Sequence, residues 1–388
     1  MMIAPSLVLR APSANRVYAE AAGPLALAEA RWVLGAHLGT VPVLRERHVG
    51  GMAALEVRPP ADGPDGPATA DGPAGPDATD RLPELLPHLL ASLSTTLGVL
   101  DLVEDAPGQE PLLRPRTLPE VHHHPADLET ILKYPGKTNE QFTALLVNLA
   151  AALSTRRAGL FDGSLALLDP LCGRGTTLNR ALRLGLSPMG AEIDRKDVET
   201  YRAFLGTWLK DHRLKHTLDS SRLTVRGEQL GTRLEVALAP DKQTLRAGGG
   251  QRLTVLGCDT VRLGELLPGR SVDALVADLP YGVQHGSRAG GTWQRSPLEV
   301  LREAAPGWRR VLRDGAGVAL AVNRRTLDHA EATAVLAEAG LRVLSPDGAF
   351  RHRVDRSIDR DVLLAVPTDH PRAAELAALG TPQEEHTP

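Results

Sequence analysis

The chain has 388 residues, of which 42% are hydrophobic and 23% charged, and its formal net charge is −3. At roughly 150 residues per domain, this is the composition of a soluble globular protein of two or three domains. Only two cysteines (Cys172 and Cys258) are present, and we find neither an apolar run long enough to span a membrane nor a secretory signal, which excludes a disulfide scaffold and favours a cytoplasmic protein.

The charge is distributed unevenly along the chain. Residues 1–130 carry 9 basic and 17 acidic residues, whereas residues 131–367 carry 34 basic and 26 acidic ones. A basic domain beside an acidic one suggests that the basic half has a polyanionic partner, such as a nucleic acid. Scatter among surface charges is the alternative interpretation.

The first third of the chain has the pattern of a small α+β domain. Residues 59–80 are almost wholly Pro, Gly, Ala, Asp and Thr, a composition that cannot offset its ordering entropy, so a disordered loop is expected there. Around that loop the apolar periodicity predicts the βαββαβ order of a ferredoxin-like unit. The predicted elements are a strand over 16–22, a helix over 25–38, strands over 41–46 and 52–58, a helix over 82–93 and a strand over 97–103.

A proline-rich segment follows and contains His122, His123 and His124. Three adjacent histidines cannot all face one metal ion from a regular element, and no cysteine or carboxylate lies at ligand spacing. We therefore expect residues 106–130 to be an exposed linker and expect no metal site.

From residue 138 onward, helices and strands alternate. Residues 138–153 have the spacing of an amphipathic helix, with Thr138 as N-cap and Gln141 in the capping-box position. The alternation that follows predicts a parallel sheet covered by helices on both faces, with an inserted hairpin within 223–250. Strands are expected at 165–169, 189–193, 253–256, 272–278, 318–322 and 361–366, and helices at 176–184, 196–209, 297–312 and 327–339.

The first of these strands ends in a glycine turn, Asp169-Pro170-Leu171-Cys172-Gly173-Arg174-Gly175-Thr176, that leads into a helix. Two glycines let the backbone pass close under a ligand, and the helix start presents free N–H groups. A dinucleotide-binding turn would need a third glycine, where this chain has Leu178. The turn by itself is a weak indication of a cofactor.

Two acidic residues follow the next two strands. Glu192 ends the second strand, about twenty residues after the glycine turn, where a carboxylate can accept both ribose hydroxyls of an adenosine-containing ligand. Asp259 follows the third strand and could meet an adenine amino group. Because acids commonly end strands, each residue alone is equally compatible with a purely structural role.

The segment Asp278-Leu279-Pro280-Tyr281-Gly282 closes the fourth strand, at the sheet edge where open α/β proteins bind ligands. The Asp278 carboxylate and a neighbouring carbonyl can accept hydrogen bonds from a planar exocyclic amine while Tyr281 stacks on its ring. Such hydrogen bonds take the lone pair of the amine out of conjugation with the ring and so make it available as a nucleophile. A simple turn would explain Pro280 and Gly282 but not the acid and the aromatic together.

In order and spacing, these motifs resemble the class I S-adenosylmethionine (SAM)-dependent amino-methyltransferases. Together with the lead-in Gly136-Lys137-Thr138-Asn139-Glu140-Gln141-Phe142, they are similar to the THUMP-associated tRNA guanine-N2 methyltransferases. Leu279 departs from the family, which has proline there and hence a stiffer loop. The resemblance implies a Rossmann-like, seven-stranded, mostly parallel sheet over 131–367, and the ferredoxin-like pattern, which we place over 1–105, fits the leading domain of the same family. We expect a disordered tail over 368–388.

The resemblance also implies roles for individual residues. Asp278, Pro280 and Tyr281 would be catalytic, and SAM would bind to Asp169, Pro170, Cys172, Gly173, Gly175, Thr176, Glu192, Asp259 and Asp278. The substrate, an RNA and foremost a tRNA, would meet Tyr281 and Gly282 and, through its phosphates, Arg324, Arg325, Arg351, Arg353 and Arg356. The alternatives are a DNA adenine-N6 or rRNA guanine-N2 methyltransferase and, from another class, a non-catalytic SAM-binding regulatory or assembly protein. The sequence does not specify an oligomeric state.

Overall fold

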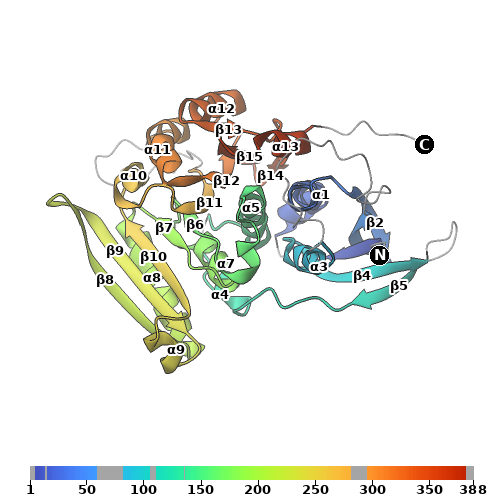
Figure 1. The fold of residues 1–388 in the computed structure, drawn as a ribbon, viewed down its shortest axis with the longest axis horizontal. Helices are drawn as coiled ribbons and strands as arrows, with labels where there is room; N and C mark the ends of the chain where they lie inside the picture. The colour runs from blue at the N-terminus through green and yellow to red at the C-terminus, as the bar shows by residue number, and fades with distance from the viewer. Residues whose placement is uncertain are drawn as a thin grey trace. The chain divides into compact units, whose positions relative to one another are not determined.

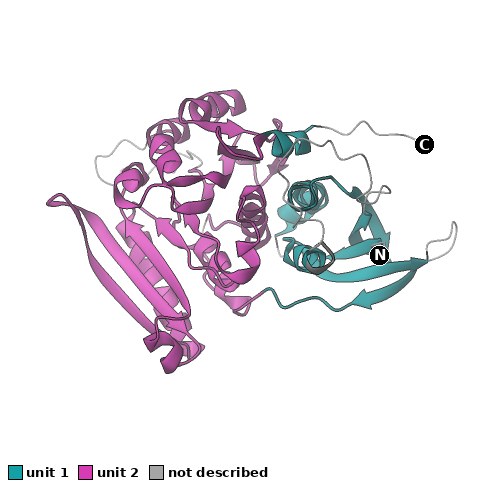
Figure 2. Cartoon of the chain, in the orientation of Figure 1, with its two compact units in different colours: residues 1–121, 374–388 teal, residues 122–373 magenta. Residues whose placement is uncertain are grey.

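The computed structural model describes residues 5–13, 15–58, 82–104, 111–134, 136–280 and 295–381 (Figure 1). The chain divides into two compact units, residues 1–121 with 374–388 and residues 122–373 (Figure 2). The loop expected over 59–80 lies outside the described residues, as do Tyr281 and Gly282. Within the described ranges, no helix has the length and apolar character needed to cross a membrane.

The first unit is built on a five-stranded antiparallel sheet. Its order is β2-β3-β1-β4-β5, so the strand that comes first in the chain lies at the centre. The elements are β1 (Ser6–Arg10), α1 (Arg16–Leu38), β2 (Val43–Val49), β3 (Met52–Arg58), α3 (Leu82–Ser92), β4 (Thr96–Glu104) and β5 (Leu112–Arg116).

The strand predicted over 16–22 is wrong, because these residues form the first turns of α1. Asn15 caps the helix by accepting a hydrogen bond from the Tyr18 N–H, and the alanines that follow are strong helix formers. The true first strand, β1, was missed because Leu7 and Val8 are both buried, one on each face of the sheet. A central strand reads as a short apolar run without alternation.

The strands predicted over 41–46 and 52–58 form the β2–β3 hairpin, which has a two-residue turn. Val49 pairs with Met52, and Gly50 and Gly51 have φ values of 53° and 80°. Positive φ at both central residues is the geometry that matches the twist of the flanking strands, and glycine adopts it without strain.

Two segments expected to lack structure are ordered. Strand β5 lies within the predicted linker and pairs along β4, where Arg116 also binds Asp101. Helix α13 (Ala373–Leu379) lies within the predicted tail; it buries Leu376 and Leu379, and Arg31 Nε donates to the Leu379 carbonyl at 2.7 Å. A few apolar residues in a polar segment suffice when a partner surface is present, and composition alone does not reveal that surface.

The second unit contains a ten-stranded sheet of order β13-β15-β12-β11-β6-β7-β10-β9-β8, with β14 on β15. The strands are β6 (Leu167–Asp169), β7 (Met189–Ala191), β8 (Lys215–Val225), β9 (Glu228–Ala239), β10 (Gln251–Gly257), β11 (Val272–Asp278), β12 (Leu312–Asn323), β13 (Leu341–Val343), β14 (His352–Arg353) and β15 (Asp359–Pro367). The helices are α4 (Asp127–Thr130), α5 (Glu140–Leu153), α6 (Gly159–Asp162), α7 (Thr176–Arg183), α8 (Arg195–Asp211), α9 (Lys242–Arg246), the 3-10 turn η1 (Thr260–Arg262), α10 (Leu263–Leu266), α11 (Pro297–Val311) and α12 (His329–Glu338).

The centre of this sheet is parallel. Strands β12, β11, β6, β7 and β10 run in one direction, and β15 runs antiparallel beside β12. The inserted hairpin is longer than expected: β8 and β9 turn at Arg226 and Gly227 and add two antiparallel strands beyond β10. Gly248, Gly249 and Gly250 lie between α9 and β10.

Helices cover both faces of the sheet. On β10, Leu256 belongs to a core shared with α10, α11 and α12, whereas Leu253 and Val255 belong to a core shared with α4, α7 and α8. Alternate residues of a strand point to opposite faces, so these two cores lie on opposite sides.

Two predictions for helix α5 are wrong. It is not amphipathic, since every residue from Phe142 to Leu153 is buried, as expected of a helix that is apolar all round. Its N-cap is Asn139 and not Thr138: the Asn139 side chain accepts from the N–H groups of Gln141 and Phe142 at 2.9 and 3.1 Å. The Thr138 hydroxyl is directed elsewhere.

Gly317 on β12 gives a test of how α5 packs on the sheet. A Cβ there would overlap the carbonyl oxygen of Ala150 and lie 2.7 Å from the Cβ of Leu153. We expect Gly317→Ala to lower the free energy of unfolding by about 1–3 kcal/mol, the usual cost of overpacking.

The matched control is Gly206→Ala in the middle of α8, where a Cβ meets only a Leu218 methyl group at 3.4 Å. Alanine should stabilise that helix by up to about 1 kcal/mol. Urea unfolding followed by circular dichroism compares the two variants, and equal stability of Gly317→Ala and wild type would contradict this packing.

Candidate functional site

A cavity of about 240 Å³ lies at the carboxyl ends of β6, β7, β10 and β11. Parallel strands bring these ends to one edge of the sheet, and the chain order reverses between β6 and β11, where open α/β sheets bind their ligands. The cavity is lined by Pro170, Leu171, Glu192, Ile193, Cys258, Asp259, Thr260, Asp278, Pro280, Arg295 and Val300.

The glycine turn after β6 depends on its two glycines. Gly173 and Gly175 have φ values of 50° and 81°, in the left-handed region. A Cβ on Gly175 would also collide with the ring of Tyr201, which is fully buried under the turn. The turn therefore leads into α7 with its backbone packed directly against α8.

Asp169 supports this turn from behind. It is 3% exposed and accepts a hydrogen bond from the Leu171 N–H at 3.0 Å. Burial raises the pKa of Asp169 to about 7, against the opposing effect of its hydrogen bonds from Leu171 and Thr177. Asp169 does not line the cavity.

Glu192 joins the tip of β7 to the glycine turn. One carboxylate oxygen accepts from the Gly173 N–H at 2.9 Å and the other from the Asp194 N–H at 2.7 Å. Burial raises the pKa of Glu192, and these two backbone hydrogen bonds oppose the rise. The carboxylate is thus fixed at the cavity wall, and each oxygen keeps a further lone pair for a ligand.

Asp259 is held by a residue that sequence analysis missed. Its Oδ1 accepts from the Val261 N–H at 3.1 Å, and its Oδ2 accepts from Arg295 Nη2 at 2.6 Å. Arg295 reaches the cavity from the segment before α11, and it carries no local motif that could have pointed to this role.

Asp278 ends β11 and lines the cavity beside Pro280. Its Oδ2 accepts from the Thr138 hydroxyl at 2.6 Å and lies 3.7 Å from Arg360 Nη2. The backbone N–H of Leu279 donates to the Ala321 carbonyl at 3.0 Å, which continues the pairing of β11 with β12. Proline has no N–H to donate, so leucine at this position ties the strand tip to the sheet.

The segment before α5 runs along the glycine turn. The Tyr134 hydroxyl lies 3.0 Å from the Thr176 hydroxyl, and the Arg174 guanidinium sits 4.8 Å above the Tyr134 ring while Arg174 Nε donates to Asp197 at 2.7 Å. Neither Tyr134 nor Arg174 has a sequence signal of its own beyond its place beside a motif.

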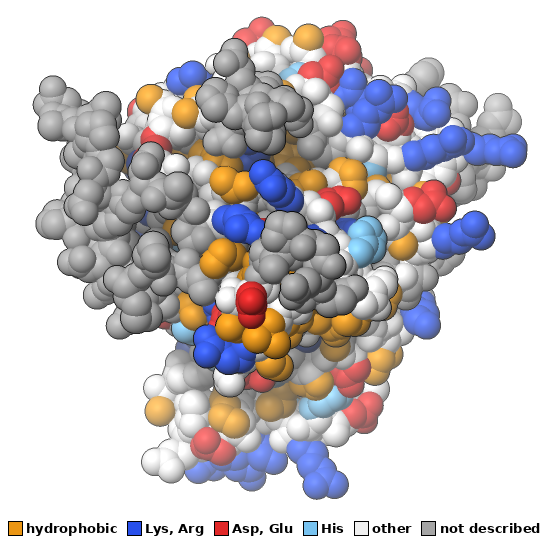
Figure 3. Space-filling model, turned by 90° about the vertical axis from the view of Figure 1, so that its right-hand side faces the viewer, with side chains coloured by type: hydrophobic (Ala, Val, Ile, Leu, Met, Phe, Trp, Pro, Cys, Tyr) orange, Lys and Arg blue, Asp and Glu red, His pale blue; other side chains and the backbone are white. Residues whose placement is uncertain are grey.

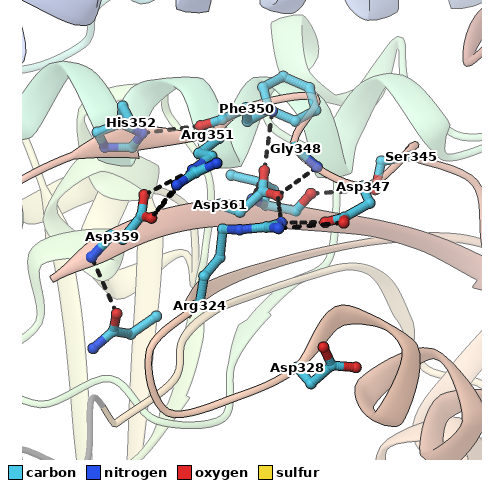
Figure 4. A network of polar contacts seen from close by, with 12 residues as sticks. Arg324, Asp328, Ser345, Asp347, Gly348, Phe350, Arg351, His352, Asp359 and Asp361 are labelled. Carbon is cyan, nitrogen blue, oxygen red and sulfur yellow. Dashed lines mark hydrogen bonds and ion pairs between the residues drawn. The ribbon is translucent and has the colours of Figure 1, made fainter.

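Of the five arginines predicted to contact phosphates, two form ion pairs within the fold (Figure 4). Arg324 pairs with Asp347 and, at 2.9 Å, with the buried Asp361, and Arg351 pairs with Asp359 at 2.8 Å. Asp361 also accepts from the N–H groups of Gly348 and Phe350 at 2.8 and 3.0 Å.

Arg325, Arg353 and Arg356 have exposed side chains. Figure 3 shows one face of the molecule, on which Lys and Arg side chains gather toward the right-hand edge with single acidic side chains among them.

Of the three histidines, His123 is exposed as expected, whereas His122 and His124 are partly buried. His122 lies 3.2 Å from Arg180, and His124 lies 2.6 Å from the Gln251 side chain. Burial, with help from Arg180, lowers the pKa of His122 to about 3. Among the residues that the structure describes, we find no group of three or more His, Cys, Asp or Glu side chains that could hold a metal ion.

No family model and no curated protein matches the chain. Similar solved structures include TrmN from Thermus thermophilus (18% identity, TM-score 0.34, covering 60% of this chain and 50% of that chain) and the rRNA methyltransferase aviRa from Streptomyces viridochromogenes (17%, 0.35, 66% and 95%). A TehB-like SAM-dependent methyltransferase from Corynebacterium glutamicum is also similar (12%, 0.31, 54% and 86%). This chain spans half the length of the TrmN chain.

The raised pKa of Asp169 predicts a pH-dependent stability. Between about pH 4 and 7 the folded protein keeps a proton on Asp169 that the unfolded chain releases, so this residue's contribution to stability falls as pH rises through that window. Asp169→Asn has no such proton, so its stability lacks this pH dependence. Between pH 4.5 and 7.5 the free energy of unfolding of the wild type should therefore fall relative to that of Asp169→Asn by about 1–4 kcal/mol. Urea unfolding of both proteins at these two pH values measures the difference, and parallel pH profiles would contradict it.

Proposed function

We propose that the chain is a class I SAM-dependent methyltransferase that methylates the exocyclic N2 amine of guanine in RNA, foremost in tRNA. The observation that carries the proposal is the cavity that brings Glu192, the glycine turn and Asp278 to one sheet edge. The parallel strands β10-β7-β6-β11-β12 follow the third-second-first-fourth-fifth order of nucleotide-binding sheets. For the first unit, the β1-α1-β2-β3-α3-β4 order supports a ferredoxin-like domain.

The charge of the cavity favours SAM over a phosphorylated nucleotide. Glu192, Asp259 and Asp278 line it, and Arg295 is the only basic side chain among its lining residues in the described ranges. Leu178, fully buried, fills the position where a dinucleotide-binding turn has its third glycine. Three carboxylates suit a ligand that presents hydroxyl and amino donors and a positive charge, and they repel phosphates.

The residues present fit such a cofactor. Glu192, rigidly held by two backbone N–H groups, would bind the ribose hydroxyls, and Asp259 would lie toward the adenine. The glycine turn would pass beneath the cofactor through Pro170, Cys172, Gly173, Gly175 and Thr176, with Asp169 supporting it. When bound, SAM supplies an electrophilic methyl group on a sulfonium centre.

Asp278 would act on the substrate amine. Its carboxylate would accept an N–H hydrogen bond, which draws the lone pair out of conjugation with the ring and aims it in one direction. Pro280 shapes the adjacent wall, and we assign stacking on the base to Tyr281 and clearance beside it to Gly282. An acid at this position also argues against a regulatory SAM-binding protein, which would have no need of it.

The excess of basic residues over 131–367 supports a nucleic-acid substrate. The arginines best placed for phosphates are Arg325, Arg353 and Arg356, because their side chains are exposed and Arg324 and Arg351 are held in ion pairs. DNA adenine and rRNA guanine are the alternative substrates. Nucleoside mass spectrometry of tRNA, rRNA and DNA from a strain without the gene separates them from tRNA guanine, because it identifies the methylated base and the nucleic acid that carries it.

We predict that Asp278→Ala lowers kcat for methyl transfer by about 10²-fold or more, because the lost group acts on the transition state. SAM affinity, measured by calorimetry, should stay within a few fold. The reciprocal variant is Glu192→Ala, which loses charge-assisted hydrogen bonds of about 1.5–3 kcal/mol and should weaken SAM binding accordingly.

Near-normal turnover of Asp278→Ala would rule out the proposed role of this carboxylate. Unchanged SAM affinity of a folded Glu192→Ala protein would show that the ribose lies elsewhere.

A second prediction concerns the RNA. Apparent affinity, measured as kcat/KM for tRNA between about 50 and 200 mM salt, should fall by about 0.7–0.9 log unit per log unit of salt for each phosphate contacted. Replacing Arg325, Arg353 and Arg356 with Gln should flatten this slope without changing SAM affinity.

The matched control replaces three arginines of the first unit, Arg16, Arg45 and Arg114, which removes the same charge from exposed side chains. It should leave the slope unchanged. A flat profile for the wild type, or equal turnover on a free nucleoside, would favour a small-molecule substrate.

A further inference from the structure

We propose that Thr138 and Arg360 are positioning residues for the Asp278 carboxylate, and this inference rests on the methyl transfer proposed above. Both groups approach the same oxygen: the Thr138 hydroxyl donates to Oδ2 at 2.6 Å, and Arg360 Nη2 lies 3.7 Å from it. They come from segments far apart in the chain, the entry to α5 and strand β15.

Thr138 is available for this contact because a neighbour has taken over the capping role. Asn139 accepts the N–H groups at the start of α5 and so fixes the backbone one residue after Thr138. On the other side, Lys137 Nζ bonds to the Glu140 carboxylate at 2.5 Å and also to the Glu129 carbonyl. With its neighbours held in this way, the Thr138 hydroxyl is directed at β11 by a backbone that has little freedom to move.

Arg360 is fixed just as firmly. Its side chain is 6% exposed, its guanidinium lies 4.7 Å from the centre of the Phe142 ring, and its backbone is paired in the sheet between Asn323 and His352. Phe142 belongs to the first turn of α5, so the helix that orients Thr138 also packs against Arg360. A rigid hydroxyl and a rigid cation on one carboxylate oxygen leave the carboxyl group a single orientation in the cavity.

Orientation matters here because Asp278 must meet the amine along one direction. Displacement of a reacting group by about 1 Å can cost 10²-fold in rate, and supporting hydrogen bonds are what hold such groups in place. The side chain of Asp278 is 23% exposed, so solvent would otherwise let it sample several rotamers.

The test is Thr138→Val, which keeps the shape of the side chain and removes its hydroxyl, in the full-length protein with SAM and tRNA. We expect kcat to fall about tenfold or more at saturating substrates, while KM for tRNA and the calorimetric Kd for SAM stay within about twofold. Thr138→Ser, which restores the hydroxyl, should recover kcat to within a few fold of the wild type.

The matched control is Thr143→Val, which removes a hydroxyl from α5, the helix that follows Thr138. Thr143 Oγ1 donates to the Asn139 carbonyl at 3.1 Å, within its own helix, so its loss should leave kcat unchanged. For the guanidinium, the variant is Arg360→Lys, which keeps the positive charge but loses the planar set of N–H donors. It should lower kcat and leave SAM affinity unchanged.

Wild-type turnover in Thr138→Val, or a loss of SAM affinity equal to its loss of kcat, would overturn the inference alone. Failure of Thr138→Ser to recover kcat would do the same, since it would assign the effect to the methyl group and not to the hydroxyl. A wild-type protein that binds SAM but methylates neither RNA nor DNA would overturn the proposed function and this inference together.

Discussion

The second unit depends on one electrostatic constraint: parallel strands place four carboxylates at a single edge of the sheet. Asp169 and Asp278 are the last residues of β6 and β11, and Glu192 and Asp259 come just after β7 and β10. Like charges in a partly buried site repel one another, and each also loses hydration. A fold with this edge must therefore compensate every one of them.

The four acids are compensated in four different ways, and the differences assign their roles. Burial raises the pKa of Asp169 to about 7, and its side chain accepts a hydrogen bond from the glycine turn at Leu171 without lining the cavity. Glu192 is held by two backbone N–H groups, and Asp259 by Arg295. Asp278 is held by a hydroxyl and a buried cation from outside the cavity. Glu192 and Asp278 thus face the cavity as acceptors held in place, Glu192 where we propose the cofactor to bind and Asp278 where we propose the substrate to bind.

The basic residues also fall into two groups, those paired within the fold and those with exposed side chains. Asp361 holds Arg324 and the N–H groups of Gly348 and Phe350, so part of the positive charge of this half is paired within the fold beside the loop before β14. Arg325, Arg353 and Arg356 of the same region are exposed and form no ion pair of this kind with the described residues, and we propose that they meet the polyanion in preference to the ion-paired Arg324 and Arg351. Counting charges along a sequence cannot separate these two groups, because both contribute equally to the total.

The sequence by itself determined the parts of the molecule that depend on local order. The alternation of strands and helices, the β2–β3 turn at Gly50 and Gly51, the glycine turn and the acids at strand ends all follow from residue type and spacing, because turns, caps and strand periodicity are short-range properties. It misjudged β1 and α5, where burial on every side removes the alternation that marks an exposed face, and β5 and α13, whose order comes from the surfaces they contact. Only the tertiary structure decided that Arg295 reaches Asp259 and that Thr138 and Arg360 reach Asp278, since these partners lie far apart in the chain and carry no shared motif. Such contacts arise from packing helices on a sheet, and no pattern of neighbouring residues encodes them.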